Sequence, residues 1–135
     1  MERRIIKVKI GFLALCSSLM LACGSNAQEN EAKNLLLEPN QFEVQLTQTT
    51  NPQLIDVRTT AEFQAGSIEG AINQDILDGS FEKYLDKLDP NKTVFVFCAK
   101  GGRSGKAAAL LKEKGFTSII DLKGGYTAWA NQSKK

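Results

Sequence analysis

Between residues 34 and 132 the apolar positions fall into two kinds of pattern that alternate along the chain. Short, mainly apolar runs predict strands at residues 35–37, 53–57, 71–73, 93–97 and 117–122. The run TVFVF at 93–97 has no polar alternation, so we expect both faces of that strand to be covered.

The segments between these runs have helical features instead. Apolar residues recur at helical spacing, or strong helix formers dominate, in residues 38–48, 59–66, 80–88, 104–115 and 124–132. Strands that alternate with helices favour a parallel sheet with helices on both faces. The pattern therefore predicts one α/β domain, residues 34–133, around a mostly parallel sheet of about five strands. In such sheets ligands bind beyond the carboxyl ends of the strands.

The first 22 residues have the features of an export signal. The segment MERRIIKVK is basic, and the apolar run IGFLALCSSLMLA after it has 13 residues, too few for a stable membrane-spanning helix. The run ends at LMLAC, which resembles the lipobox where bacterial lipoprotein signals are cleaved and the cysteine is lipidated. We therefore expect an exported lipoprotein of the periplasm or cell envelope, with a signal at 1–22, a membrane anchor on Cys23 and a flexible tether at 23–33. Ordinary secretory cleavage after Ala27 is the alternative.

Removal of that signal changes the charge balance and the cysteine count. Four of the 17 basic residues and one of the 15 acidic residues lie in it, so 13 basic and 14 acidic residues remain. This balance predicts no basic surface for nucleic acid. Cys16 leaves with the signal and Cys23 is expected to be lipidated, which leaves Cys98 as a free thiol without a disulfide partner. The chain has no histidine, so Cys–His and Ser–His catalytic pairs are excluded and a metal site is disfavoured.

Cys98 opens the stretch CAKGGRSG, directly after the most hydrophobic predicted strand. Gly101 and Gly102 allow successive backbone N–H groups to turn inward as an anion-binding nest, and the next helix adds the positive end of its dipole. Lys100 and Arg103 add full charges. Together these groups are expected to lower the thiol pKa and to hold an anionic sulfur substrate. The alternative is that Cys98 is a small buried residue that ends a strand.

Three stretches resemble the rhodanese family of sulfurtransferase domains: LIDVRTTAEFQAGSIEGAIN, FCAKGGRSGKAAALL and GFTSIIDLKGGYTAW. They lie in the family's order and span about residues 35–130. The resemblance implies a three-layer rhodanese-like fold. It also implies an enzyme in which Cys98 takes a sulfane sulfur from a donor such as thiosulfate, becomes a persulfide, and passes the sulfur to cyanide or a thiol. The implied substrate-binding residues are Ala99, Lys100, Gly101, Gly102, Arg103 and Ser104, through their backbone amides and the Lys100 and Arg103 side chains.

Two other functions are weighed against this one. A rhodanese module without turnover, which binds or carries sulfur for an exported partner protein, is the main alternative. Related phosphatases and arsenate reductases also place cysteine and arginine around an anion, with a loop one residue longer than the four residues between Cys98 and Arg103. The shorter loop fits a persulfide and crowds a tetrahedral phosphate. We expect a monomer that needs no cofactor.

Polar residues near the other predicted strand ends are expected to be structural. Arg58 and Glu62 are four residues apart and are positioned to pair, while Asp56 can accept hydrogen bonds from the adjoining turn. Ser67 stands where the family usually has histidine, which we expect to change local packing more than catalysis. Four acids in and around residues 80–88 are expected on a solvated face: Asp75, Asp78, Asp86 and Asp89.

Overall fold

The computed structural model describes residues 33–132. The predicted export signal, Cys23 and the predicted tether up to residue 32 lie outside the described residues. Within the described part of the chain, no helix is both long and apolar enough to cross a membrane.

Five strands form one sheet, and every neighbouring pair runs parallel. The strands are β1 (Lys33–Leu37), β2 (Gln53–Asp56), β3 (Ile72–Asn73), β4 (Val94–Phe97) and β5 (Ser118–Leu122). Their order across the sheet is β1-β5-β4-β2-β3, so β4 is central and β1 and β3 form the edges. The predicted α/β architecture is confirmed, with a sheet that is parallel throughout.

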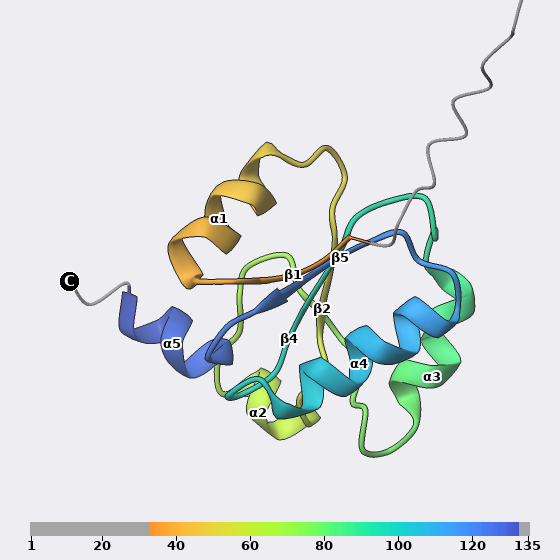
Figure 1. Cartoon of the computed structure of the whole chain (residues 1–135). Coiled ribbons are helices and arrows are strands. Elements are labelled where there is room, and N and C mark those ends of the chain that lie inside the picture. The colour runs from red at the N-terminus through yellow and green to blue at the C-terminus, as the bar shows by residue number, and fades with distance from the viewer. Residues whose placement is uncertain (1–32, 133–135) are drawn as a thin grey trace, which may run out of the picture.

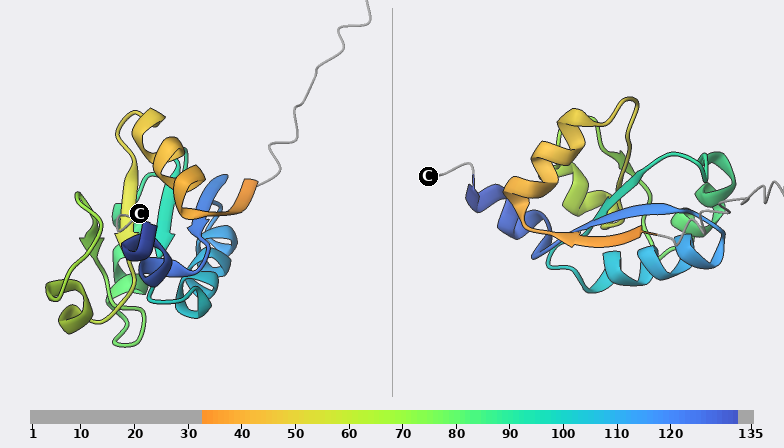
Figure 2. Two further views of the ribbon diagram at one scale, coloured as in Figure 1. Left: turned by 90° about the vertical axis from the view of Figure 1, so that its left-hand side faces the viewer. Right: turned by 45° about the horizontal axis from the view of Figure 1, so that its top comes forward.

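Helices cover both faces of this sheet, as the sequence predicts. They are α1 (Pro39–Gln48), α2 (Thr60–Gln64), α3 (Ser80–Tyr84), α4 (Gly102–Glu113) and α5 (Gly125–Gln132), with a short 3₁₀ helix η1 (Leu85–Lys87) after α3. In Figure 1, α3 and α4 lie on one side of the sheet, and α1 and α5 lie on the other. The right-hand view of Figure 2 shows α1 above the sheet and α4 below it.

The sheet separates two hydrophobic cores, and β4 contributes to both. Val94, Val96 and Cys98 face the core under α3 and α4, while Phe95 and Phe97 face the core under α1 and α5. Each of these side chains is at most 1% exposed, so both faces of β4 are covered, as its unbroken apolar run predicts. Burial of a valine or phenylalanine contributes about 1.5–3 kcal/mol, which makes β4 the anchor of the loop that follows it.

Local sequence signals account for the start of α2 and for the end of the segment formed by α3 and η1. Thr59 caps α2: its hydroxyl accepts the Glu62 N–H at 3.3 Å, and the Glu62 carboxylate accepts the Thr59 N–H at 3.0 Å. The helix predicted at 80–88 is split, because α3 gives way to η1 at Leu85. The tighter 3₁₀ geometry is common in a last turn, and here it precedes the helix-breaking Asp89-Pro90.

Candidate active site

The loop that carries Cys98 connects the central strand β4 to α4. Cys98 directly follows the last residue of β4, and α4 begins at Gly102. The loop therefore lies at the carboxyl edge of the sheet, where the sequence places the ligand site. Gly101, the residue before α4, has a φ of 112°, a conformation that glycine adopts without the steric cost of a side chain.

The sulfur of Cys98 is enclosed by this loop. The residue is 1% exposed, and the Gly101 N–H donates to Sγ at 3.0 Å. Burial raises the pKa of the Cys98 thiol, but hydrogen bonds from the Ser104 hydroxyl and from the N–H groups of Ser104, Gly101 and Lys100 oppose it. The hydrogen bonds outweigh burial, so the thiol pKa lies below its ordinary value, in agreement with the sequence-based expectation.

The start of α5 fixes the orientation of the same loop. The N–H of Tyr126 donates to the Cys98 carbonyl at 2.7 Å, and the N–H of Thr127 donates to the Ala99 carbonyl at 3.1 Å. These carbonyl groups are therefore held away from the sulfur. A Cβ atom at Gly125 would lie 2.4 Å from the Cys98 carbonyl oxygen, so the loop and α5 approach closely only because Gly125 has no side chain.

Arg103, in the first turn of α4, forms a bidentate ion pair with Glu62 of α2. Its Nη1 and Nη2 atoms donate to the two carboxylate oxygens at 2.8 and 2.7 Å. The Arg103 hydrogen bonds lower the pKa of Glu62 to about 2, against the effect of burial. The predicted Arg58–Glu62 pair is wrong, because α2 turns the Glu62 carboxylate toward α4 instead.

Arg58 forms an ion pair with Asp56, the last residue of β2. The guanidinium donates to both Asp56 carboxylate oxygens, with Nη2 at 2.6 Å from Oδ2, and the pair is almost fully buried. Its central carbon lies 4.3 Å from the ring centroid of Tyr126. Ser67 donates its hydroxyl to Asp56 Oδ2 at 2.7 Å, so Ser67 completes this buried network. The predicted structural role of Asp56 and Arg58 agrees with this arrangement.

The structure gives the predicted loop residues different positions around the sulfur. Gly101 and the fully buried Ser104 supply groups that act on Sγ. Lys100 is exposed, and its side chain makes no ion pair with any residue of the described chain. The Arg103 guanidinium is already engaged by Glu62, so it is held in a fixed place beside the loop.

A family model described as the rhodanese-like domain matches residues 38–132 of this chain. The chain belongs to the rhodanese-like family. The family match includes the cysteine loop, the α2 segment with Glu62, and the start of α5 that holds the loop carbonyl groups.

Known proteins similar to this rhodanese-like chain differ in their named functions. It is 33% identical over 93 residues to the thiosulfate sulfurtransferase GlpE of Shewanella oneidensis, a match that covers 69% of this chain and 89% of GlpE. It is 30% identical over 113 residues to the tRNA uridine(34) hydroxylase of Pelagibacter ubique, covering 83% of this chain but only 37% of that protein. The crystal structure of a rhodanese-related protein from Thermoplasma volcanium matches with a TM-score of 0.63 at 26% identity, over 73% of this chain and 92% of that one.

Two residues that contact the cysteine loop or its helix were not predicted as functional. Glu62 could have been suspected from its position three residues after Thr59, but its partner Arg103 is 41 residues away. In the sequence, Gly125 is distinguished only as the second residue of the pair Gly124-Gly125.

Asp75 also differs from its prediction. It is 9% exposed, and its Oδ1 accepts the Leu77 N–H at 2.8 Å, so Asp75 is a buried turn residue. The expectation of a solvated position is wrong for Asp75, because the loop before α3 folds back over the sheet edge: Ile76 donates its N–H to the Val57 carbonyl.

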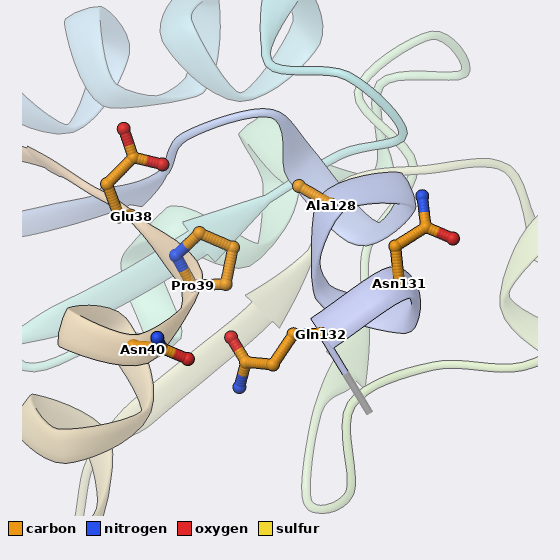
Figure 3. Close-up of a pocket in the computed structure, with 6 residues that line it drawn as sticks. All are labelled: Glu38, Pro39, Asn40, Ala128, Asn131 and Gln132. Carbon is orange, nitrogen blue, oxygen red and sulfur yellow. The ribbon is translucent and has the colours of Figure 1, made fainter. Parts of the chain in front are cut away.

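A groove of about 580 Å³ lies elsewhere on the rhodanese domain, between the start of α1 and α5. Figure 3 shows Glu38, Pro39 and Asn40 on one side and Ala128, Asn131 and Gln132 on the other. None of these six residues belongs to the cysteine loop, and none has a nucleophilic side chain. The groove therefore does not compete with Cys98 as the reactive centre.

Proposed function

We propose that this protein is a rhodanese-type sulfurtransferase that carries sulfur as a persulfide on Cys98. The observation that supports the proposal most directly is the Gly101 N–H at 3.0 Å from Sγ, at the N-terminus of α4. A thiolate at this position is stabilised by oriented N–H groups, without the need for a histidine. The match to the thiosulfate sulfurtransferase GlpE points to the same chemistry.

In the first half-reaction, the Cys98 thiolate attacks the outer sulfur of a donor such as thiosulfate. A bond forms between Sγ and that sulfur, the sulfur–sulfur bond of thiosulfate breaks, and sulfite leaves with its electron pair. The N–H groups of the loop then stabilise the terminal sulfur of the persulfide as they stabilise the thiolate. The persulfide and the thiolate both carry negative charge at the N-terminus of α4. Lys100, exposed at the rim, adds a positive charge on the path of the anionic donor.

In the second half-reaction, cyanide or a thiolate attacks the terminal sulfur. The new carbon–sulfur or sulfur–sulfur bond forms as the Sγ–sulfur bond breaks, and Cys98 leaves as the thiolate. Thiocyanate or the persulfide of the acceptor is released, and no separate oxidant or reductant is consumed. The enzyme is therefore ready for the next donor.

The test uses the full-length chain with Cys16→Ser and Cys23→Ser, called the Cys98-only chain, so that one thiol remains. It is incubated with thiosulfate, and its intact mass and the release of thiocyanate after addition of cyanide are measured. We expect a mass gain of one sulfur atom and turnover, both lost in the matched Cys98→Ser variant. A folded Cys98-only chain that gains no sulfur from thiosulfate or from other persulfide donors would contradict the enzymatic proposal and favour a module that binds a partner protein.

We further propose that the protein is exported and anchored through a lipid on Cys23. The lipobox-like LMLAC and the polar segment after it support this proposal. Metabolic labelling with a fatty acid is expected to mark the wild-type protein and not the Cys23→Ser variant. Equal labelling of both proteins, or of neither, would exclude the anchor on Cys23.

A further inference from the structure

Strand β1 forms an open edge of the sheet, because its one neighbour among the described residues is β5. The N–H of Lys33 and the carbonyl of Leu37 bond to the residues that flank β5, each over 2.8 Å. Successive residues of a strand direct their N–H and C=O groups to opposite sides. The backbone groups of Asn34 and Leu36 therefore point away from the sheet, and within residues 33–132 no strand pairs with them.

The residues of β1 do not protect this edge. Folded proteins usually shield an edge strand by making it very short, or by placing charged residues, proline or a bulge in it. The opposite edge strand, β3, is two residues long. β1 has five residues, KNLLL, with a charge only at Lys33 and no proline, and the Leu36 side chain is 60% exposed. Another strand can therefore pair with β1 more readily than with β3.

A groove lies beside this edge, between β1 and α1. Its volume is about 370 Å³, and its apolar lining comes from Leu35, Leu37 and Val44. Val44 is 50% exposed on α1, the helix that lies above β1 in the right-hand view of Figure 2. A strand added at an edge gains main-chain hydrogen bonds, and its alternate side chains enter the pockets beside it. The edge and the groove together fit an extended segment that carries a large apolar side chain.

The segments next to the described domain do not supply such a side chain. Residues 24–32, GSNAQENEA, contain no apolar residue larger than alanine, and residues 133–135, SKK, contain no apolar residue. The β1 strand of a second copy does supply one, because its alternate residues include Leu35 and Leu37. A second copy of this chain thus offers what the adjacent segments lack.

The charges at the two ends of β1 favour an antiparallel arrangement of two copies. Lys33 is the first residue of β1, and Glu38 directly follows its last residue. An antiparallel pair places the basic end of each strand beside the acidic end of the other, whereas a parallel pair would bring like charges together. Glu38 is already paired with Lys123, but both side chains are 57% exposed, so a second cation can approach the Glu38 carboxylate.

The outward-facing backbone groups select one register. In an antiparallel sheet, opposite residues whose backbone groups face each other exchange both of their hydrogen bonds. Asn34 of each copy then lies opposite Leu36 of the other, and Leu35 lies opposite Leu35 on a twofold axis. A register centred on Leu36 would place Asn34 opposite Glu38, whose carbonyl already accepts the N–H of Phe42 at 2.9 Å. The register centred on Leu35 therefore uses the free backbone groups of the edge most completely.

We propose that β1 is a dimer interface, at which two copies of this chain pair antiparallel with Leu35 on the twofold axis. The two five-stranded sheets then form one continuous sheet. Cys98 follows β4, which β5 separates from β1, so the interface covers neither cysteine loop. The carboxyl edges of the two sheets face opposite directions, which places the two cysteine loops at opposite ends of the joint sheet. The sequence led us to expect a monomer, and the open edge of β1 changes that expectation.

A disulfide cross-link tests the twofold axis. Leu35→Cys and Leu36→Cys are introduced separately into the full-length chain with Cys16→Ser, Cys23→Ser and Cys98→Ser. In the proposed dimer the two Cα atoms at position 35 lie about 4.5 Å apart, within reach of a disulfide. The two Cα atoms at position 36 are offset along the strands and lie about 9 Å apart, beyond that reach.

Under mild oxidation we expect Leu35→Cys to form a covalent dimer at least about tenfold faster than Leu36→Cys, because only its geometry suits a disulfide. The covalent dimer is measured on non-reducing gels. Leu36 is the more exposed of the two side chains, so random collision would favour the opposite result. Equal rates, or a faster reaction of Leu36→Cys, in chains shown to be folded by circular dichroism, would overturn the proposed axis.

The variant Leu36→Pro tests the hydrogen bonds of the edge. Proline removes the outward N–H, and an edge strand tolerates proline where that N–H faces solvent, so the monomer should fold normally. Leu36→Val keeps the N–H and serves as the matched control. Sedimentation velocity of the Cys98-only chain should show a concentration-dependent dimer that persists in Leu36→Val. In Leu36→Pro we expect association at least about tenfold weaker, because the twofold axis removes the same hydrogen bond from both copies.

A Cys98-only chain that remains monomeric would overturn the proposal, and so would a Leu36→Pro chain that dimerises as strongly as Leu36→Val. Protection of the Asn34 and Leu36 amides from hydrogen exchange in such a monomer would assign the edge to another segment of the same chain. Sedimentation and cross-linking need no sulfur donor. Their outcome is therefore independent of the proposed sulfurtransferase activity.

Discussion

At the scale of single residues, two adjacent glycines in the cysteine loop have different physical roles. Gly101 has a φ of 112° and donates its N–H to Sγ, whereas Gly102 begins α4 and is not among the residues with positive φ. Neither glycine has an atom within 4 Å of where a Cβ would be placed. Backbone conformation, rather than space, therefore separates the two positions.

We expect Gly101→Ala to impair sulfur transfer and Gly102→Ala to be tolerated. A side chain at the strained position costs about 1–3 kcal/mol, which the loop would relieve by turning the N–H away from Sγ. A loss of that size in transition-state stabilisation corresponds to a fall in kcat/KM of about fivefold to 150-fold. Gly102→Ala should retain near-normal kcat/KM and gain helix stability.

The two variants are compared by kcat/KM for thiosulfate and by the midpoint of denaturant unfolding. Equal effects of the two substitutions on kcat/KM would contradict this prediction. They would show that the positive φ of Gly101 is not what keeps its N–H directed at Sγ of Cys98.

At the scale of secondary-structure elements, α2 and α4 are joined by the ion pair between Glu62 and Arg103. A third of the Glu62 side chain is exposed, 34%, so solvent screens the pair, and its contribution to stability is about 0.2–1 kcal/mol. The main effect of the pair is thus geometric. It fixes Arg103 beside the sulfur loop while the same carboxylate caps α2.

Glu62→Gln should lower the free energy of unfolding at neutral pH by up to about 1 kcal/mol. Glutamine keeps one oxygen that can accept the Thr59 N–H of the capping box, but its amide nitrogen cannot accept a bond from Arg103, so the charge and one of the two Arg103 hydrogen bonds are lost. The pKa of Glu62 falls from 4.5 to about 2 in the folded protein, so its contribution is fully present above pH 4.5 and is lost as the pH falls through 2. Urea unfolding of both proteins across this range should show the difference disappearing at low pH, whereas a constant difference would mean that the charge is not what stabilises the pair.

The elements themselves were predictable, and the contacts between them were not. The apolar run before Cys98, the helix formers after Gly105 and the cap at Thr59 are local signals, so β4, α4 and α2 follow from sequence. The Glu62 prediction failed because local spacing suggested Arg58, while the true partner is brought in by the packing of α2 beside α4. The cysteine loop could be predicted because its glycines, its charged residues and the start of the next helix follow one another in the sequence. Asp121 is in register with Val96 of β4, a long-range pairing that no local pattern encodes.

At the scale of the whole molecule, the buried acid Asp121 lowers the stability of the fold at neutral pH. Its carboxyl pKa rises from 3.8 to about 6 on folding because burial disfavours the charged form. A carboxyl group whose pKa is raised contributes stability that is fully present below pH 3.8 and is lost as the pH rises through 6. At neutral pH the folded protein therefore holds a buried charge that a core position would ordinarily exclude.

Asp121→Asn should accordingly stabilise the fold at high pH. The amide has no charge to bury, so at pH 8 the variant is expected to unfold at a free energy about 2–3 kcal/mol higher than its parent, with no difference near pH 4. Denaturant unfolding is measured at both pH values in the Cys98→Ser background, which removes the titration of the thiol. A stability difference that does not change with pH would mean that Asp121 is accommodated as a charge and that its burial costs nothing.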